Sequence, residues 1–130
     1  MSSCNNKPSL YKPILHKKEL EMTFSALEKL LKMIEERKTA HVDSSYTASL
    51  LAHAPEKPIR KLAEEVTELL IDVMKGDING ATKEAADVLY HYLIVLSAAD
   101  ISFSDVLSEL ERREGVSGYA EKQNRPKTSK

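Results

Sequence analysis

Apolar residues recur at intervals of three and four along most of this 130-residue chain, and this spacing restricts the fold more than any other feature. It is the period of an amphipathic helix, in which such residues share one face. The alternation of β-branched and polar residues that is typical of strands is found nowhere in the sequence. We therefore expect one all-α domain, an antiparallel bundle of about four to five helices, because short connections join antiparallel neighbours.

Boundary signals place the first two helices. Ser25 and Glu28 fit a capping box, which predicts that the first helix begins between Thr23 and Ser25. A short helix is expected over the segment SYTASLLAH, with Ser44 or Ser45 as its N-cap, since a hydroxyl there can accept a hydrogen bond from a free backbone N–H.

Two longer helices and a final one are predicted next. The first runs from about Glu56 to Lys75 and ends at Gly76, a residue that readily adopts the left-handed conformation. In the following GDING segment an Asp or Asn side chain is expected to cap the second helix, which ends near Ala99. The last helix is expected to begin near one of the serines in ISFS and to end before Gly115.

These helices define a domain over residues 23–115, between a flexible leader at 1–22 and a basic C-terminal tail at 116–130. Apolar runs are far too short to cross a bilayer, and the first residues contain no signal-peptide core. Cys4 is the one cysteine, so a cysteine-based metal site within one chain is excluded. We expect a cytoplasmic protein, with neither a membrane nor a nucleic-acid polymer as its partner.

Five carboxylates lie where the two long helices can face each other. They are Glu64, Glu65 and Glu68 on the first helix and Glu84 and Asp87 on the second. Within each helix the spacings of three and four residues put the acids on one stripe. A short turn between antiparallel helices can bring the two stripes together.

Taken alone, the first set is better explained by solvation than by function, because glutamates at this spacing are common on exposed helices. The second set is different. In EAADVLYHYLIVLSAAD, Asp87 is the only ionised residue between Glu84 and Asp100 when His91 is neutral. A carboxylate in such an apolar helix needs a partner or a metal, and crowded carboxylates raise one another's pKa unless a cation lies among them.

The donor set indicates which cation is suited. Oxygen ligands favour Mg²⁺, with Mn²⁺ as the second choice, and His91 as the sole nearby histidine argues against iron. Mg²⁺ commonly joins carboxylates to substrate phosphates, so the chemistry indicated is on a polyphosphate.

The acids also carry a resemblance to known families. Glu64-Glu65-x-x-Glu68, fifteen intervening residues and Glu84-x-x-Asp87 resemble the signature of the MazG-like all-α nucleoside triphosphate pyrophosphohydrolases. The segments SSYTASLLAHAPEKPIRKLAEEVTELLID, EAADVLYHYLIVL and ISFSDVLSELERREG are similar, more narrowly, to the phosphoribosyl-ATP pyrophosphohydrolase family of histidine biosynthesis. The resemblance covers about residues 23–115.

The resemblance implies hydrolysis of phosphoribosyl-ATP to phosphoribosyl-AMP and pyrophosphate, in a homodimer or larger homo-oligomer whose subunits together complete the active site. The metal ligands that it implies are Glu65, Glu68, Glu84 and Asp87. It leaves Glu64 as a further ligand or as the base that orients water.

Three other side chains are candidates for substrate binding, each with a plainer alternative. Lys61 either contacts phosphate or forms a salt bridge with Glu65. His91 contacts substrate or holds Asp87, and the alternative is a packed, hydrogen-bonded histidine. Arg112 either reaches the second phosphate end of the substrate or is solvated at the end of its helix. Two other functions stay open: a housekeeping nucleoside triphosphate pyrophosphohydrolase and a non-catalytic helical interaction module.

Overall fold

All regular structure in the described part of the chain, which a computed structural model gives as residues 16–115, 122–123 and 125–126, is helical. Five α-helices lie entirely within these residues: α1 (Lys17–Arg37), α2 (Tyr46–Ala52), α3 (Glu56–Lys75), α4 (Ile78–Ala98) and α5 (Phe103–Arg113). A single 3₁₀ turn, η1 (Val42–Ser44), precedes α2. The prediction of an all-α fold with about four to five helices is confirmed. The tail predicted at 116–130 lies largely outside the described residues.

The start predicted for the first helix is wrong. α1 begins at Lys17, with His16 as its N-cap, so residues 17–22 of the expected leader are helical. The Glu19 carboxylate accepts a hydrogen bond of 2.9 Å from the backbone N–H of His16. This pair provides a boundary about two and a half turns before the Ser25 signal, and the intervening KKELEM favours a helix.

The other predicted boundaries are confirmed. The Ser45 side chain caps α2 by accepting from the Ala48 N–H at 3.0 Å. α3 ends at Gly76 in the left-handed conformation, at φ 73°. The Asp77 carboxylate then accepts from the N–H of Gly80 at 2.9 Å and begins α4. The turn between the two long helices is therefore short, which makes them antiparallel.

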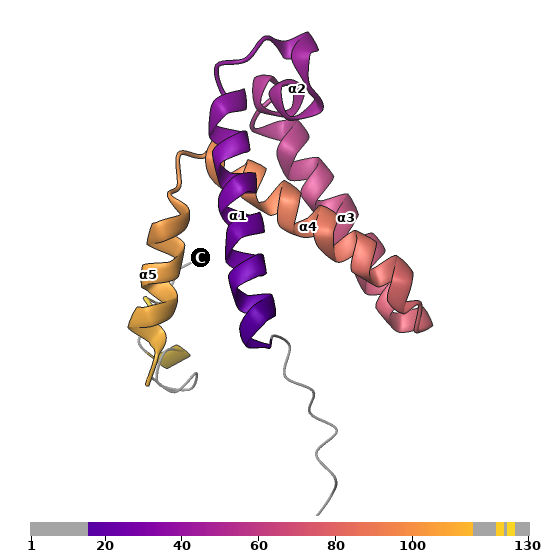
Figure 1. Ribbon diagram of the computed structural model, residues 1–130, viewed down its shortest axis with the longest axis vertical. Coiled ribbons are helices and arrows are strands. Elements are labelled where there is room, and N and C mark those ends of the chain that lie inside the picture. The colour runs from indigo at the N-terminus through magenta and orange to yellow at the C-terminus, as the bar shows by residue number, and fades with distance from the viewer. Residues whose placement is uncertain (1–15, 116–121, 124, 127–130) are drawn as a thin grey trace, which may run out of the picture.

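α3 and α4 form a hairpin that projects from the rest of the domain, while α1 crosses the second half of α4 and α5 lies beside α1 (Figure 1). The fully buried core lies where α1, α2 and α4 meet, and it consists of Ile34, Leu50, Leu93 and Ile94. Packing at this end of the hairpin fixes the position of both long helices.

The outer half of the hairpin keeps large apolar side chains exposed. Leu70, Val73 and Met74 on α3 and Ile78 at the start of α4 are all exposed, and Met74 reaches 87%. The apolar stripe of α3 is therefore only partly covered by this chain. An apolar surface of this kind marks a contact surface for another molecule. Among the helices described, none combines the length and apolar character that crossing a membrane requires.

Candidate metal centre

The α3–α4 hairpin brings carboxylates from both helices together. Glu65 on α3 and Glu84 and Asp87 on α4 each offer a carboxylate oxygen, and these three oxygens lie within 4.8 Å of one another. The tight turn at Gly76 and Asp77 fixes the register in which the two helices face each other. Three oxygens at this separation can contact one cation.

The electrostatics of these groups show how crowded they are. Glu65 is only 9% exposed, and the Oε2 atom of Glu84 is buried without a hydrogen-bond partner in the described structure. Contact with Glu65, then burial and contact with Glu68, raise the pKa of Glu84 to about 7. Burial alone would raise the pKa of Glu65, but contacts with Glu84 and Lys61 outweigh it and lower that pKa. Without a cation, the pair therefore shares a proton below about pH 7.

A divalent cation suits this arrangement. It would replace the shared proton and give the unpartnered Glu84 oxygen a ligand, so the three acids could all be ionised. A set made only of carboxylate oxygens suits Mg²⁺ or Mn²⁺. Asp87 is exposed, so one side of the centre is open to an incoming molecule.

The remaining α3 acids border the centre. Glu68 lies close enough to Glu84 to raise the pKa of Glu84. Glu64 and Glu68 are both exposed, and neither is one of the three clustered acids. The Lys61 ammonium contacts Glu64 at 2.9 Å and Glu65 at 3.2 Å. The salt bridge considered for Lys61 is therefore present, and hydrogen bonds with both glutamates raise its pKa. Lys61 holds the two glutamates in place.

His91 is packed beside the centre. It is 4% exposed, and burial lowers its pKa, with Glu65 and Lys61 acting in opposite directions. Its ring meets those of Tyr46 and Tyr90 edge-on, at centroid distances of 6.2 and 5.0 Å. Its Nδ1 atom is buried and has no hydrogen-bond partner among the described residues. His91 is therefore packed, as one alternative predicted, but its Nδ1 lacks the hydrogen bond that the same alternative included.

Arg112 is not brought to the acids within one chain. It lies on α5, which Figure 1 shows on the far side of α1 from the hairpin. Its guanidinium contacts Glu109 of the same helix at 2.7 and 2.8 Å. A role for Arg112 in substrate binding stays a prediction.

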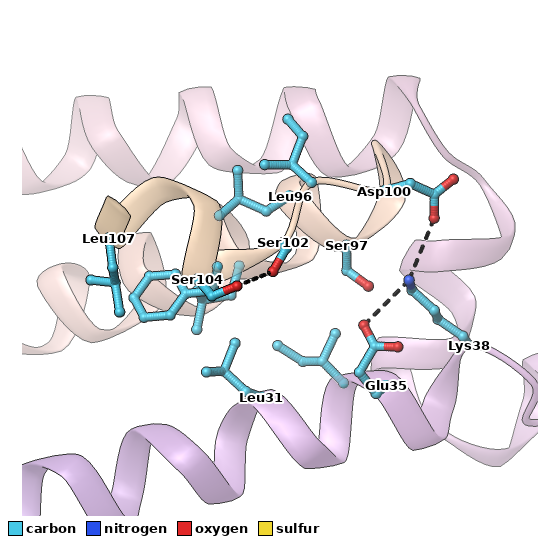
Figure 2. Close-up of a pocket in the computed structure, with 13 residues that line it drawn as sticks. Leu31, Glu35, Lys38, Leu96, Ser97, Asp100, Ser102, Ser104 and Leu107 are labelled. Atoms are coloured by element: carbon cyan, nitrogen blue, oxygen red, sulfur yellow. Dashed lines mark hydrogen bonds and ion pairs between the residues drawn. The ribbon is translucent and has the colours of Figure 1, made fainter. Parts of the chain in front are cut away.

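One cavity of the described structure is also separate from the acids. It has a volume of about 580 Å³ and lies between α1, the end of α4 and α5. Leucine, isoleucine and phenylalanine side chains form most of its wall, and Lys38 contacts Glu35 and Asp100 at one end (Figure 2). None of the five candidate acids lines it.

Known proteins match the helical part of this chain, which includes the clustered acids. The family model described as phosphoribosyl-ATP pyrophosphohydrolase matches residues 27–114. A protein of Cereibacter sphaeroides (strain ATCC 17025) named phosphoribosyl-ATP pyrophosphatase is 52% identical over 101 residues, which are 78% of this chain and 98% of that protein. Proteins of the same name from Dinoroseobacter shibae and Roseobacter denitrificans are also 52% identical, over 78% and 76% of this chain and 99% and 94% of their own lengths. The chain therefore belongs to the phosphoribosyl-ATP pyrophosphohydrolase family.

Proposed function

We propose that this chain hydrolyses phosphoribosyl-ATP to phosphoribosyl-AMP and pyrophosphate, the second step of L-histidine biosynthesis. The observation that carries the proposal is the cluster of Glu65, Glu84 and Asp87, in which a buried carboxylate oxygen lacks a partner. Membership of the family and the names of the relatives support the choice of substrate.

A divalent cation is part of this proposal. The side chains that would hold it are Glu65, Glu68, Glu84 and Asp87, and their oxygen ligands favour Mg²⁺ over softer ions. When bound, the cation supplies charge neutralisation and polarisation of the phosphoanhydride. The open side of the centre at Asp87 admits the triphosphate, and the buried side at Glu65 excludes bulk water.

The side chains carry the proton transfer. Glu64 is exposed, and the Lys61 ammonium holds its carboxylate at 2.9 Å. In this position Glu64 orients a water molecule and accepts its proton as the water oxygen bonds to phosphorus. The α–β anhydride bond breaks, and the bridging oxygen keeps the bonding electron pair, which gives phosphoribosyl-AMP and pyrophosphate. The Lys61 ammonium, which contacts both Glu64 and Glu65, offsets the repulsion between their carboxylates.

A homodimer, or a larger homo-oligomer, is the proposed assembly. The exposed side chains of Leu70, Val73, Met74 and Ile78 support it, because burial of a large apolar side chain contributes about 1.5–3 kcal/mol. A partner subunit on this surface would also lie along the hairpin that carries the acids (Figure 1). The proposed location is the cytoplasm, where the single cysteine would remain reduced.

Pyrophosphate release from phosphoribosyl-ATP, ATP and deoxynucleoside triphosphates, each with and without Mg²⁺, tests the proposal. We expect metal-dependent release from phosphoribosyl-ATP alone. Comparable release from free nucleotides would instead indicate a housekeeping pyrophosphohydrolase, and no release from any substrate would leave the interaction module. Glu68→Ala and Asp87→Ala should abolish release and retain helical circular dichroism.

A further inference from the structure

An exposed aromatic ring contacts His91, which is packed near the acid centre. Tyr46, at the start of α2, is 52% exposed, and its ring contacts the buried His91 ring edge-on at an interplanar angle of 89°. The Lys57 ammonium lies 5.9 Å from the centroid of the same ring. Because the Tyr46 side chain is exposed in this position, its ring can stack against a flat ligand.

Two further contacts hold the chain segment that carries this ring. Ser45 caps the helix that Tyr46 begins, by accepting from the Ala48 N–H. The next residue, Thr47, is buried and shares a hydrogen bond with the Tyr90 hydroxyl on α4. Tyr46 therefore keeps its place relative to α4, which carries two of the clustered acids.

Lys57, Lys61 and Glu65 form one stripe on α3, because each follows the one before by four residues. The rise of a helix puts Lys57 about 12 Å along the axis from Glu65. His91 contacts Tyr46 and lies close enough to Glu65 for that carboxylate to act on its pKa. The ring and Lys57 thus lie at one end of a stripe whose other end is the acid centre.

The two lysines on this stripe differ in their partners. Lys61 is neutralised by Glu64 and Glu65. Lys57 donates to the Ser49 hydroxyl at 3.3 Å, and across the described residues no carboxylate forms an ion pair with it. Its charge therefore remains available to an anionic ligand.

We propose that Tyr46 stacks against the purine of phosphoribosyl-ATP and that Lys57 contacts the phosphate on its additional ribose. This inference rests on the proposed function and deepens it. The substrate carries phosphates at both ends of a purine, and this part of the chain offers a metal centre, an aromatic ring and, beside the ring, a lysine without a carboxylate partner among the described residues. Free ATP lacks the additional ribose and its phosphate, so it has no group that can reach Lys57. These two residues therefore select phosphoribosyl-ATP over ATP.

Steady-state kinetics on the full chain test the inference. Stacking of a base on an aromatic ring contributes enough that Tyr46→Leu should raise KM for phosphoribosyl-ATP about tenfold, with kcat changed less than about twofold. Tyr46→Phe keeps the ring and should restore KM to within about twofold of the wild type. Lys57→Ala should also raise KM about tenfold.

Two controls separate binding from structure. Lys75→Ala removes the same charge at the opposite end of α3 and should leave both constants unchanged. Pyrophosphate has neither a purine nor a ribose, so its inhibition constant should change less than about twofold in Tyr46→Leu and Lys57→Ala. A merely structural role would lower kcat, weaken inhibition by pyrophosphate and lower the melting temperature together.

Each outcome decides the inference. An unchanged KM in Tyr46→Leu and Lys57→Ala, with wild-type turnover of phosphoribosyl-ATP intact, refutes this inference alone. A wild type that releases no pyrophosphate from phosphoribosyl-ATP refutes the proposed function, and the inference with it. If Tyr46→Leu lowers the melting temperature, Lys57→Ala still decides the contact with the second phosphate, and failure to raise KM there overturns it.

Discussion

Lowering the pH from about 8 to about 6 should weaken Mg²⁺ binding to this protein about tenfold. The reason is the carboxyl group of Glu84, whose pKa contact with Glu65 raises to about 7. About nine tenths of this group is ionised at the higher pH and about one tenth at the lower pH. Mg²⁺ must displace the remaining proton, so its apparent affinity follows the ionised fraction.

Isothermal titration calorimetry measures this linkage directly. Titrations at about pH 6 in two buffers of different ionisation enthalpy should show release of about 0.9 proton for each Mg²⁺ bound, and about 0.1 proton at about pH 8. Equal affinity at the two pH values, with no dependence of the heat on the buffer, would refute the assignment of Glu84 as a ligand that is protonated in the metal-free state.

A matched variant controls for general effects of charge. Glu109 on α5 is also a glutamate, but hydrogen bonds from Arg112 and Arg113 lower its pKa to about 2. It is ionised over the whole range, so Glu109→Gln should keep both the affinity and its pH dependence. Glu84→Gln should lose most of the affinity and all of the proton release.

The same structure makes three other predictions. Without metal, the pKa of Glu84 is raised in the folded state, so the stability that this group contributes is complete below its unfolded pKa near 4.5 and is lost as the pH rises through about 7. Glu84→Gln should therefore raise the melting temperature of the metal-free protein at about pH 8, as circular dichroism can measure. Gly76→Ala should lower the free energy of unfolding by about 1 kcal/mol, because φ is 73° there. An added Cβ meets no atom within 4 Å, so the cost comes from the backbone conformation alone. Gly76→Asn should lower the free energy of unfolding less, as denaturant titration can show. Leu70→Asp should dissociate the proposed homodimer, and sedimentation velocity that finds one unchanged species would contradict the placement of the interface.

The sequence predicted the hairpin well because each of its boundaries depends on local chemistry. Gly76 ends α3 and Asp77 begins α4 through contacts within a few residues, so the pattern of residues identifies them. The facing of Glu65, Glu84 and Asp87 then follows from helix period and a short turn. The start of α1 was not predicted, because two sets of capping residues compete there and the one at His16 and Glu19 prevails.

Other features depend on tertiary contacts and could not be predicted. The spacing of apolar residues predicted that α3 is amphipathic. It does not show that Leu70 and Val73 remain exposed when a single chain folds. The edge-on contact of Tyr46 with His91 joins residues from α2 and α4, and no spacing within the sequence predicts such a contact. The position of Arg112 away from the hairpin likewise depends on how α5 packs (Figure 1).

The central claim is that the clustered acids hold the cation that hydrolysis of phosphoribosyl-ATP requires. The most direct measurement is the initial rate of pyrophosphate release from that substrate by the wild type and by Asp87→Asn, each with Mg²⁺ and with a chelator. We expect the wild-type rate to depend on Mg²⁺ and the Asp87→Asn rate to fall about a hundredfold, at an unchanged melting temperature. A wild type that is fully active in chelator, or an Asp87→Asn variant that keeps the wild-type rate, would contradict the claim.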